Sequence, residues 1–216
     1  QTLENGEAWV LLEKGEIIEL ASVSGYPTLL SFIEAGEEAI KQIDTWKKSS
    51  DAKRYQLADV RIKAPIYPRK NIFCVGKNYL EHVAEMAEAD HQKEAPKYTV
   101  FFTKPYTSII AHEEGVQSYP ELTQMLDYEG ELAVVIGKRG INIPKEEALD
   151  YVFGYTIMND ISARDLQRRH LQFFKGKSLD TFAPLGPVIT HHSAIGDPQN
   201  LSIKTYVNDE LRQNGN

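Results

Sequence analysis

Most apolar positions along the chain recur at strand spacing or in short apolar runs that polar turns interrupt. Short runs of this kind predict strands rather than helices. Two of the turns are typical hairpin signals: Lys14-Gly15 near the start of the chain and Asn208-Asp209 near its end. The expected strands are residues 8–12, 16–20, 57–62, 71–75, 100–103, 129–136, 154–158, 188–190, 203–207 and a short return arm at 210–213.

Helical spacing is confined to a few segments. Ile40, Ile43 and Trp46 predict one amphipathic helix over residues 37–47. Because strands outnumber helices and no strand–helix–strand unit repeats, the pattern predicts a strand-rich α+β fold. The other expected helices are residues 79–89, 145–151 and 163–171, the last with Ser162 as its N-cap.

The polar run KKSSDAKR, residues 47–54, predicts a boundary between two domains. We expect a small N-terminal α/β unit and linker over residues 1–54, and the main domain over residues 55–216. The return arm of the last hairpin is too short to complete a domain, so we expect further residues after Asn216 and an intact mass above 24.5 kDa. The chain begins at Gln1 rather than Met, so we expect residues before it as well.

Composition narrows the class of partner. The chain is 42% hydrophobic and 25% charged, which is typical of a globular protein. The formal charge is −7 and basic residues form no dense cluster, so we expect no nucleic-acid partner. The single cysteine, Cys74, excludes an internal disulfide and a Cys-rich zinc site and is typical of a reducing cytoplasm. No apolar stretch reaches 18 residues, so we expect a cytoplasmic protein without a membrane partner.

The segment LDYEGELAVVIG, residues 126–137, places two carboxylates at the start of an apolar strand. Glu129 and Glu131 share one face of the strand, with Cα atoms about 6.5–7 Å apart. Like charges that lead into a buried strand are costly unless a positive group lies between them. Asp160 follows another strand and can supply a third oxygen, a set that suits Mg²⁺ or Mn²⁺. The alternative is a pair of exposed carboxylates on a solvent face, and the spacing alone leaves both open.

Two further motifs carry groups suited to catalysis. His82 and Glu85, in VGKNYLEHVAEM, lie three residues apart on one face of the predicted helix. A carboxylate beside an imidazole orients it and raises its basicity, as a general base requires. Lys177 lies between aromatic residues and a Pro-Gly turn, where its ammonium can contact an oxyanion or a carboxylate. The alternatives are a surface His–Glu pair and a solvated lysine.

From residue 66 onward the chain resembles the fumarylacetoacetate hydrolase superfamily. The segments that carry the resemblance are VGKNYLEHVAEM, FFTKP, LDYEGELAVVIGKRG, YTIMNDISARDLQ and KGKSLDTFAPLGPVIT. It looks most like bacterial members with an N-terminal extension that decarboxylate oxaloacetate. The resemblance implies a mixed β-sandwich roll and a homodimer. The family continues into further strands and a glycine-rich TGTP-type loop that these 216 residues do not contain.

The resemblance also assigns roles to individual residues. It implies Mg²⁺ or Mn²⁺ held by Glu129, Glu131 and Asp160. It implies that His82 and Glu85 form a catalytic dyad and that Lys177 contacts the substrate. The residues that would line the pocket are Gly76, Lys77, Asn78 and Thr181.

Together these features predict metal-dependent cleavage of a C–C bond in a small 2-oxo acid through a metal-stabilised enolate. Oxaloacetate decarboxylation is the first candidate, followed by hydrolysis of an acylpyruvate or fumarylpyruvate and by keto–enol isomerisation. A non-catalytic scaffold that binds a metal or metabolite is the alternative from another class. Residues 85–97 are polar with few apolar anchors, and we expect residues 79–97 to form a lid over the site. The alternative is an ordinary solvated surface helix.

Overall fold

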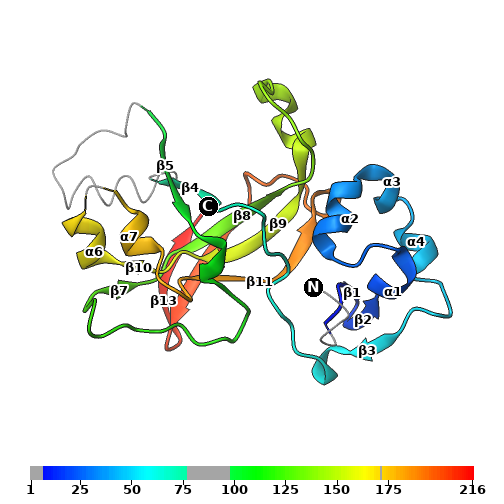
Figure 1. Ribbon diagram of the computed structural model, residues 1–216, viewed down its shortest axis with the longest axis horizontal. Helices are drawn as coiled ribbons and strands as arrows, with labels where there is room; N and C mark the ends of the chain where they lie inside the picture. Colours follow the sequence, from blue (N-terminus) through cyan, green and yellow to red (C-terminus); the bar gives the residue numbers. More distant parts are fainter. Residues whose placement is uncertain (1–6, 77–97, 171) are drawn as a thin grey trace. The chain divides into compact units, whose positions relative to one another are not determined.

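The computed structural model describes residues 7–76, 98–170 and 172–216 (Figure 1). It is rich in strands and has only short helices, which confirms the predicted α+β class. The chain divides into two compact units, one of residues 1–67, 134–156 and 186–194, and one of residues 68–133, 157–185 and 195–216. The described part of the predicted N-terminal domain lies entirely in the first unit, while the boundary near residue 54 stays a prediction.

The first unit contains an antiparallel three-stranded sheet in the order β1-β2-β3. Its strands are β1 (Val10–Glu13), β2 (Glu16–Glu19) and β3 (Arg54–Gln56). The predicted first hairpin is confirmed, because Lys14 and Gly15 turn with positive φ values of 52° and 84°.

Four short helices pack an aromatic core in this unit (Figure 1). Trp9 stacks on Phe32 with ring centroids 4.8 Å apart, and both side chains are buried. The helices are α1 (Ala21–Ser24), α2 (Leu29–Ala35), α3 (Glu37–Ile40) and α4 (Ile43–Trp46).

Two predictions about this region are wrong. Residues 37–47 form two short helices rather than one, because the Gln42 N–H bonds to the carbonyl three residues back and tightens the turn. Residues 57–62 do not form a strand: the strand β3 ends at Gln56, and Leu57–Asp59 is a 3₁₀ helix. Ala58 and Asp59 are poor strand formers, which is consistent with the early end of β3.

A four-stranded sheet has the order β6-β11-β9-β8. Its strands are β6 (Ile109–Ile110), β11 (Ala183–His191), β9 (Val152–Asn159) and β8 (Gly130–Ile136). Strands predicted at 129–136, 154–158 and 188–190 are confirmed, the last two with wider bounds. Gly154 is required in β9, because a Cβ there would lie 2.3 Å from the carbonyl oxygen of Thr190.

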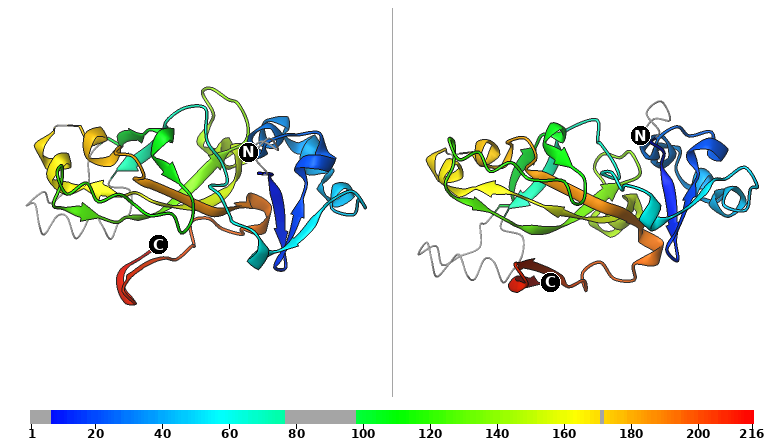
Figure 2. Two further views of the ribbon diagram at one scale, coloured as in Figure 1. Left: turned by 60° about the horizontal axis from the view of Figure 1, so that its bottom comes forward. Right: turned by 90° about the horizontal axis from the view of Figure 1, so that it is seen from below.

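The second unit adds three two-stranded pairs, each antiparallel. They are β4 (Ile72–Gly76) with β5 (Val100–Lys104), β7 (Leu126–Asp127) with β10 (Ser162–Ala163), and β12 (Ile203–Val207) with β13 (Glu210–Gly215). The last pair is the predicted C-terminal hairpin, red in Figure 2, and Asn208 and Asp209 form its turn with φ values of 49° and 67°.

The remaining helical predictions are confirmed only in part. Residues Lys145–Tyr151 form a 3₁₀ helix, and the predicted helix at 163–171 is the shorter α6 (Arg164–Arg169), followed by α7 (Phe174–Lys177). Ser162 is not an N-cap, because it lies in β10 and its hydroxyl donates to the Asp160 carbonyl. The predicted helix at 79–89 lies outside the described residues. In the part of the chain that the structure describes, no helix has both the length and the apolar character needed to cross a membrane.

Replacing Gly154 with alanine should destabilise the protein by about 1–3 kcal/mol, because the added methyl group meets rigid backbone atoms of β11. Thermal and urea unfolding of the variant measure this loss. Gly196→Ala is the matched control, since a Cβ at that position has no atom within 4 Å, and its effect should stay within about 0.5 kcal/mol. Equal stability of the two variants would contradict the packing at Gly154.

Candidate active site

Two backbone-anchored contacts bring Glu129 and Asp160 together. Asp160 follows the end of β9, and its N–H donates to the Glu129 carbonyl at 2.7 Å. In return, the Glu129 N–H donates to the side-chain oxygen of Asn159 at 3.1 Å. The start of β8 is therefore fastened to the end of β9, and two carboxylates from distant parts of the chain face a common region.

A fully buried lysine holds Asp160 from one side. Lys104 is the last residue of β5, and its side chain has 0% exposure. Its ammonium donates to Asp160 Oδ1 at 2.6 Å, to the Ile161 carbonyl at 3.0 Å, and to the Lys177 carbonyl. Three acceptors use all three N–H groups of a protonated lysine, so the geometry favours the charged form.

A second buried lysine lies between the two carboxylates. Lys177 ends α7, and its ammonium donates to Asp160 Oδ2 at 2.7 Å and to Glu129 Oε2 at 2.5 Å. The same ammonium lies 4.9 Å from the centroid of the Phe102 ring, a favourable cation–π distance. The expectation that Lys177 belongs to the same site as Glu129 and Asp160 agrees with this geometry.

Arg164, at the start of α6, supplies the third cation. Its Nη2 atom lies 2.5 Å from Glu129 Oε1 and 2.7 Å from Asp127 Oδ2. Its Nε also donates to Asp127 at 2.7 Å, and its Nη1 donates to Gln167 at 3.1 Å. Every oxygen of the Glu129 and Asp160 carboxylates therefore has a cationic partner in the described structure.

These contacts determine the charge states. Burial alone would raise the pKa of the Asp160 carboxyl, but Lys104 and Lys177 outweigh burial and hold that pKa below its usual value. Burial lowers the pKa of Lys104, and Asp160 offsets only part of that effect. Burial also acts to lower the pKa of Arg164, but Glu129 and Asp127 raise it overall. Asp160 is thus ionised at neutral pH, inside a cluster in which opposite charges compensate one another.

The buried Cys74, in β4, is not a nucleophile of this site. Burial, and next the negative charge of Asp160, raise the pKa of its thiol to about 12. The thiolate is the reactive form of cysteine, so this thiol is inert near neutral pH.

The predicted metal ligands are of the chemical type that a hard divalent cation binds. Glu129 and Asp160 converge on one point, which the Lys177 ammonium takes in the described structure, and carboxylate oxygens are the donors that Mg²⁺ and Mn²⁺ prefer. Glu131 is half-buried in β8, two residues further on. Among residues 7–76, 98–170 and 172–216, no three His, Cys, Asp or Glu side chains are arranged as a metal site. The full set of three ligands therefore stays a prediction.

The other predicted residues are only partly described. His82, Glu85, Lys77 and Asn78 lie outside the described residues, as does the predicted lid at 79–97. Gly76 ends β4, where a Cβ would contact Val100, Phe102 and Phe173 at 3.5–3.7 Å. Thr181 has a positive φ of 71°, and its hydroxyl accepts the Gln117 N–H at 2.9 Å. Its place in a substrate pocket stays a prediction.

Sequence reasoning assigned no role to Lys104, Arg164 and Asp127, although each lies in a segment that carries the family resemblance. The signal that points to basic residues is the negative charge of the predicted acids. Three carboxylates around one point need positive side chains nearby, and the ends of neighbouring strands and helices can supply them. Lys104 ends an apolar strand in FFTKP, and Arg164 follows Asp160 in NDISARD, so both are candidates by this criterion.

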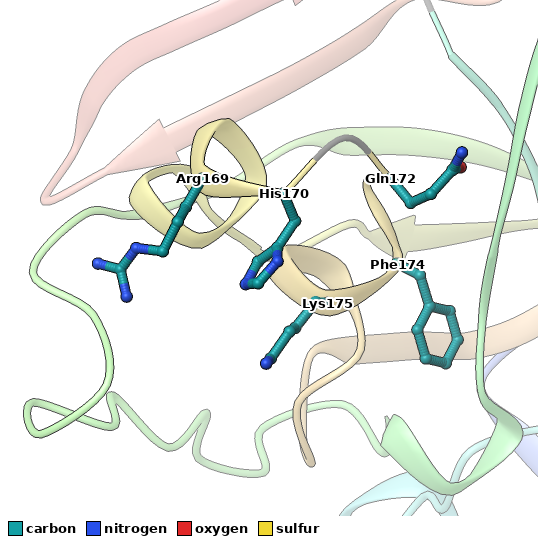
Figure 3. Close-up of a pocket in the computed structure, with 5 residues that line it drawn as sticks. All are labelled: Arg169, His170, Gln172, Phe174 and Lys175. Carbon is teal, nitrogen blue, oxygen red and sulfur yellow. The ribbon is translucent and has the colours of Figure 1, made fainter.

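An open surface pocket of about 470 Å³ lies beside α6 and α7 (Figure 3). It is lined by Arg169, His170, Gln172, Phe174 and Lys175. In Figure 3 the side chains of Arg169, His170 and Lys175 extend toward the same side. Of the predicted site residues that the structure describes, none lines this pocket, so it is distinct from the carboxylate cluster.

Comparison with known proteins gives consistent matches. A family model described as fumarylacetoacetate (FAA) hydrolase C-terminal matches residues 71–216. Oxaloacetate tautomerase YisK of Bacillus subtilis (strain 168) is 48% identical over 215 residues, which cover 94% of this chain and 69% of the relative. The mitochondrial oxaloacetate tautomerase fahd2 of Xenopus laevis is 38% identical over 214 residues, covering 95% of this chain and 64% of the relative. The chain thus spans about two-thirds of the length of these relatives.

A solved structure shares the fold. Fumarylacetoacetate hydrolase (EaFAH) from the psychrophile Exiguobacterium antarcticum superposes with a TM-score of 0.78 at 43% identity, covering 94% of this chain and 69% of that one. The family match, the identity to curated relatives and the shared fold agree with the motifs around Glu129, Asp160 and Lys177. The chain therefore belongs to the fumarylacetoacetate hydrolase family, whose members are enzymes that act on small organic acids.

Proposed function

We propose that this chain catalyses enolate chemistry on a small 2-oxo acid, with oxaloacetate as the first candidate. One observation carries the proposal: Glu129 and Asp160 converge on a single cationic point inside a buried, charge-compensated cluster. Buried groups with shifted pKa values and specific charge partners are typical of active sites. The names of two relatives, both oxaloacetate tautomerases, support the same substrate class.

Members of this family generally depend on a divalent metal. In our proposal Glu129, Glu131 and Asp160 hold Mg²⁺ or Mn²⁺. When bound there, the cation supplies positive charge that stabilises the negative charge developing on the oxygens of a 2-oxo acid.

The two buried lysines have different tasks in this proposal. Lys104 is held by three acceptors, two of them backbone carbonyls, so its ammonium stays in place and keeps Asp160 ionised and oriented. Among the described residues, the Lys177 ammonium donates only to carboxylate oxygens and otherwise lies against the Phe102 ring, and its four-carbon side chain can turn. We infer that the Lys177 ammonium moves from the carboxylates to the substrate, where it pairs with an oxygen of the 2-oxo acid.

The same stabilisation serves more than one reaction. Tautomerisation moves a proton between the enol oxygen and the adjacent carbon of oxaloacetate. Decarboxylation breaks the bond to the distal carboxylate, releases CO₂ and leaves the pyruvate enolate. Both need negative charge stabilised on the 2-oxo oxygen. The names of the relatives favour tautomerisation, which the sequence analysis placed behind decarboxylation.

Hydrolytic cleavage of a C–C bond, in an acylpyruvate or a related diketo acid, is the second candidate, because the similar solved structure is named as a fumarylacetoacetate hydrolase. It requires a base that activates water, a role predicted for His82 with Glu85. A homodimer of this chain likewise stays a prediction, which light scattering after size-exclusion chromatography can test.

Purified protein with Mg²⁺ or Mn²⁺ should interconvert the keto and enol forms of oxaloacetate faster than buffer does, and EDTA should remove the activity. Ultraviolet absorbance follows the enol, a coupled assay for pyruvate detects decarboxylation, and an acylpyruvate tests hydrolysis. Pyruvate in D₂O should exchange its methyl protons when protein and metal are present. If there is neither exchange nor turnover of any of these acids, the protein is a non-catalytic scaffold and the proposal is wrong.

Glu131→Ala should lower kcat/KM by about 100-fold or more, because loss of a direct ligand costs at least as much as loss of a residue that orients one. The variant should stay folded and unfold cooperatively, so that the loss of activity reports on the site rather than on the fold. The control is Glu147→Ala, an exposed residue of the 3₁₀ helix Lys145–Tyr151. Wild-type activity in Glu131→Ala would remove Glu131 from the site.

Lys104→Met should destabilise the protein by about 3–5 kcal/mol, because it leaves one buried carboxylate oxygen and two carbonyls without a donor. Lys138→Met is the matched control: Lys138 is half-exposed and 3.5 Å from Glu37, so its loss should cost less than about 1 kcal/mol. Urea unfolding of both variants measures the difference. Similar small losses would show that Lys104 does not support the cluster.

A further inference from the structure

The backbone N–H and carbonyl of the glycine between the two predicted glutamate ligands share an unusual partner. Gly130 separates Glu129 from Glu131, and its N–H donates to Oε1 of Gln213 at 2.9 Å. The carbonyl of Gly130 accepts from Nε2 of the same side chain, also at 2.9 Å. The Gln213 amide thus pairs with Gly130 on both sides, as a backbone amide of a neighbouring strand would do.

A neighbouring residue fixes the orientation of that amide. Gln213 lies in β13 opposite Thr205 of β12, and the Thr205 hydroxyl donates to Oε1 of Gln213 at 2.9 Å. Two donors therefore converge on Oε1, which leaves Nε2 directed at the Gly130 carbonyl. The C-terminal hairpin therefore holds the side-chain amide of Gln213 in the orientation that binds Gly130.

Only glycine permits this close approach. A Cβ at position 130 would lie 2.5 Å from Oγ1 of Thr205 and 3.2 Å from Oε1 of Gln213. Gly130 is also buried, so its N–H and carbonyl need partners within the protein. The sequence Glu-Gly-Glu thus places between two carboxylates a residue whose backbone can hydrogen-bond to the C-terminal hairpin.

We propose that Gln213 is a positioning residue that sets the directions of the Glu129 and Glu131 carboxylates. Side chains at i and i+2 of an extended segment share a face only while the backbone of the residue between them stays extended. Gln213 holds that backbone on both its N–H and its carbonyl, while the Asn159 side chain holds the Glu129 N–H. The inference rests on the proposed function, in which these two carboxylates hold a divalent cation.

The test is the affinity of the protein for Mn²⁺ without substrate, measured from the electron paramagnetic resonance signal of the free ion. Gln213→Ala should weaken Mn²⁺ binding about 10-fold or more, the effect typical of residues that orient metal ligands. Asn214→Ala is the matched control, because it deletes an amide from the adjacent, exposed position of β13. That variant should bind Mn²⁺ as the wild type does. At saturating Mn²⁺, Gln213→Ala should recover most of its kcat.

A second variant separates positioning from folding. Gln213→Met keeps the length of the side chain but cannot pair with Gly130. Because it leaves the buried N–H and carbonyl of Gly130 without this partner, its unfolding temperature should fall by several degrees, while unfolding stays cooperative and the protein stays folded at the temperature of the binding assay. Weaker Mn²⁺ binding in a folded Gln213→Met would support the inference. Wild-type affinity in both Gln213 variants, with Glu131→Ala unable to bind, would overturn the inference alone. A wild type that binds no Mn²⁺ would overturn the metal site and the inference with it.

Discussion

A buried carboxylate needs a positive partner, and this requirement organises the second unit of the structure. Asp160 is 3% exposed and would be costly as an ion in that position without Lys104 and Lys177. The two ammonium groups come from the ends of β5 and α7, and Arg164 at the start of α6 neutralises Glu129 beside them. Four separate segments are thus held to one point by opposite charges and hydrogen bonds.

The two buried lysines differ in the hydrogen-bond partners of their ammonium groups. The Lys104 ammonium is fixed by two carbonyls in addition to Asp160, so it stabilises the framework. Within the described part of the chain, the Lys177 ammonium has only carboxylate oxygens and an aromatic face as partners, and no backbone carbonyl fixes it. A buried ammonium between the two carboxylates compensates both of them, so neither carries an unpaired buried charge in the described structure.

The C-terminal hairpin links this chemistry to the fold. Its turn follows from two residues that tolerate positive φ, and its second strand brings Gln213 to Gly130. Gln213 can approach because Gly130 has no side chain. This contact in turn sets the directions in which the side chains of Glu129 and Glu131 extend. Hydrogen bonds to the N–H and the carbonyl of Gly130 thus couple the C-terminal hairpin to the acidic cluster.

The sequence by itself determined the fold class, the two hairpins, most strands and the motifs that identify the family, because alternation, turn residues and motif spacing are local signals. It did not determine the break of the helix at 37–47, the loss of the strand at 57–62, or the true start of α6, because backbone hydrogen bonding and strand pairing decide these. The acids could be named from their spacing in the chain, whereas the contacts that Lys104, Arg164 and Gln213 make could not. Lys104 binds Asp160, Arg164 binds Glu129 and Gln213 binds Gly130, and in each pair the two residues lie far apart in sequence. Only the tertiary structure brings these donors within 3 Å of their acceptors.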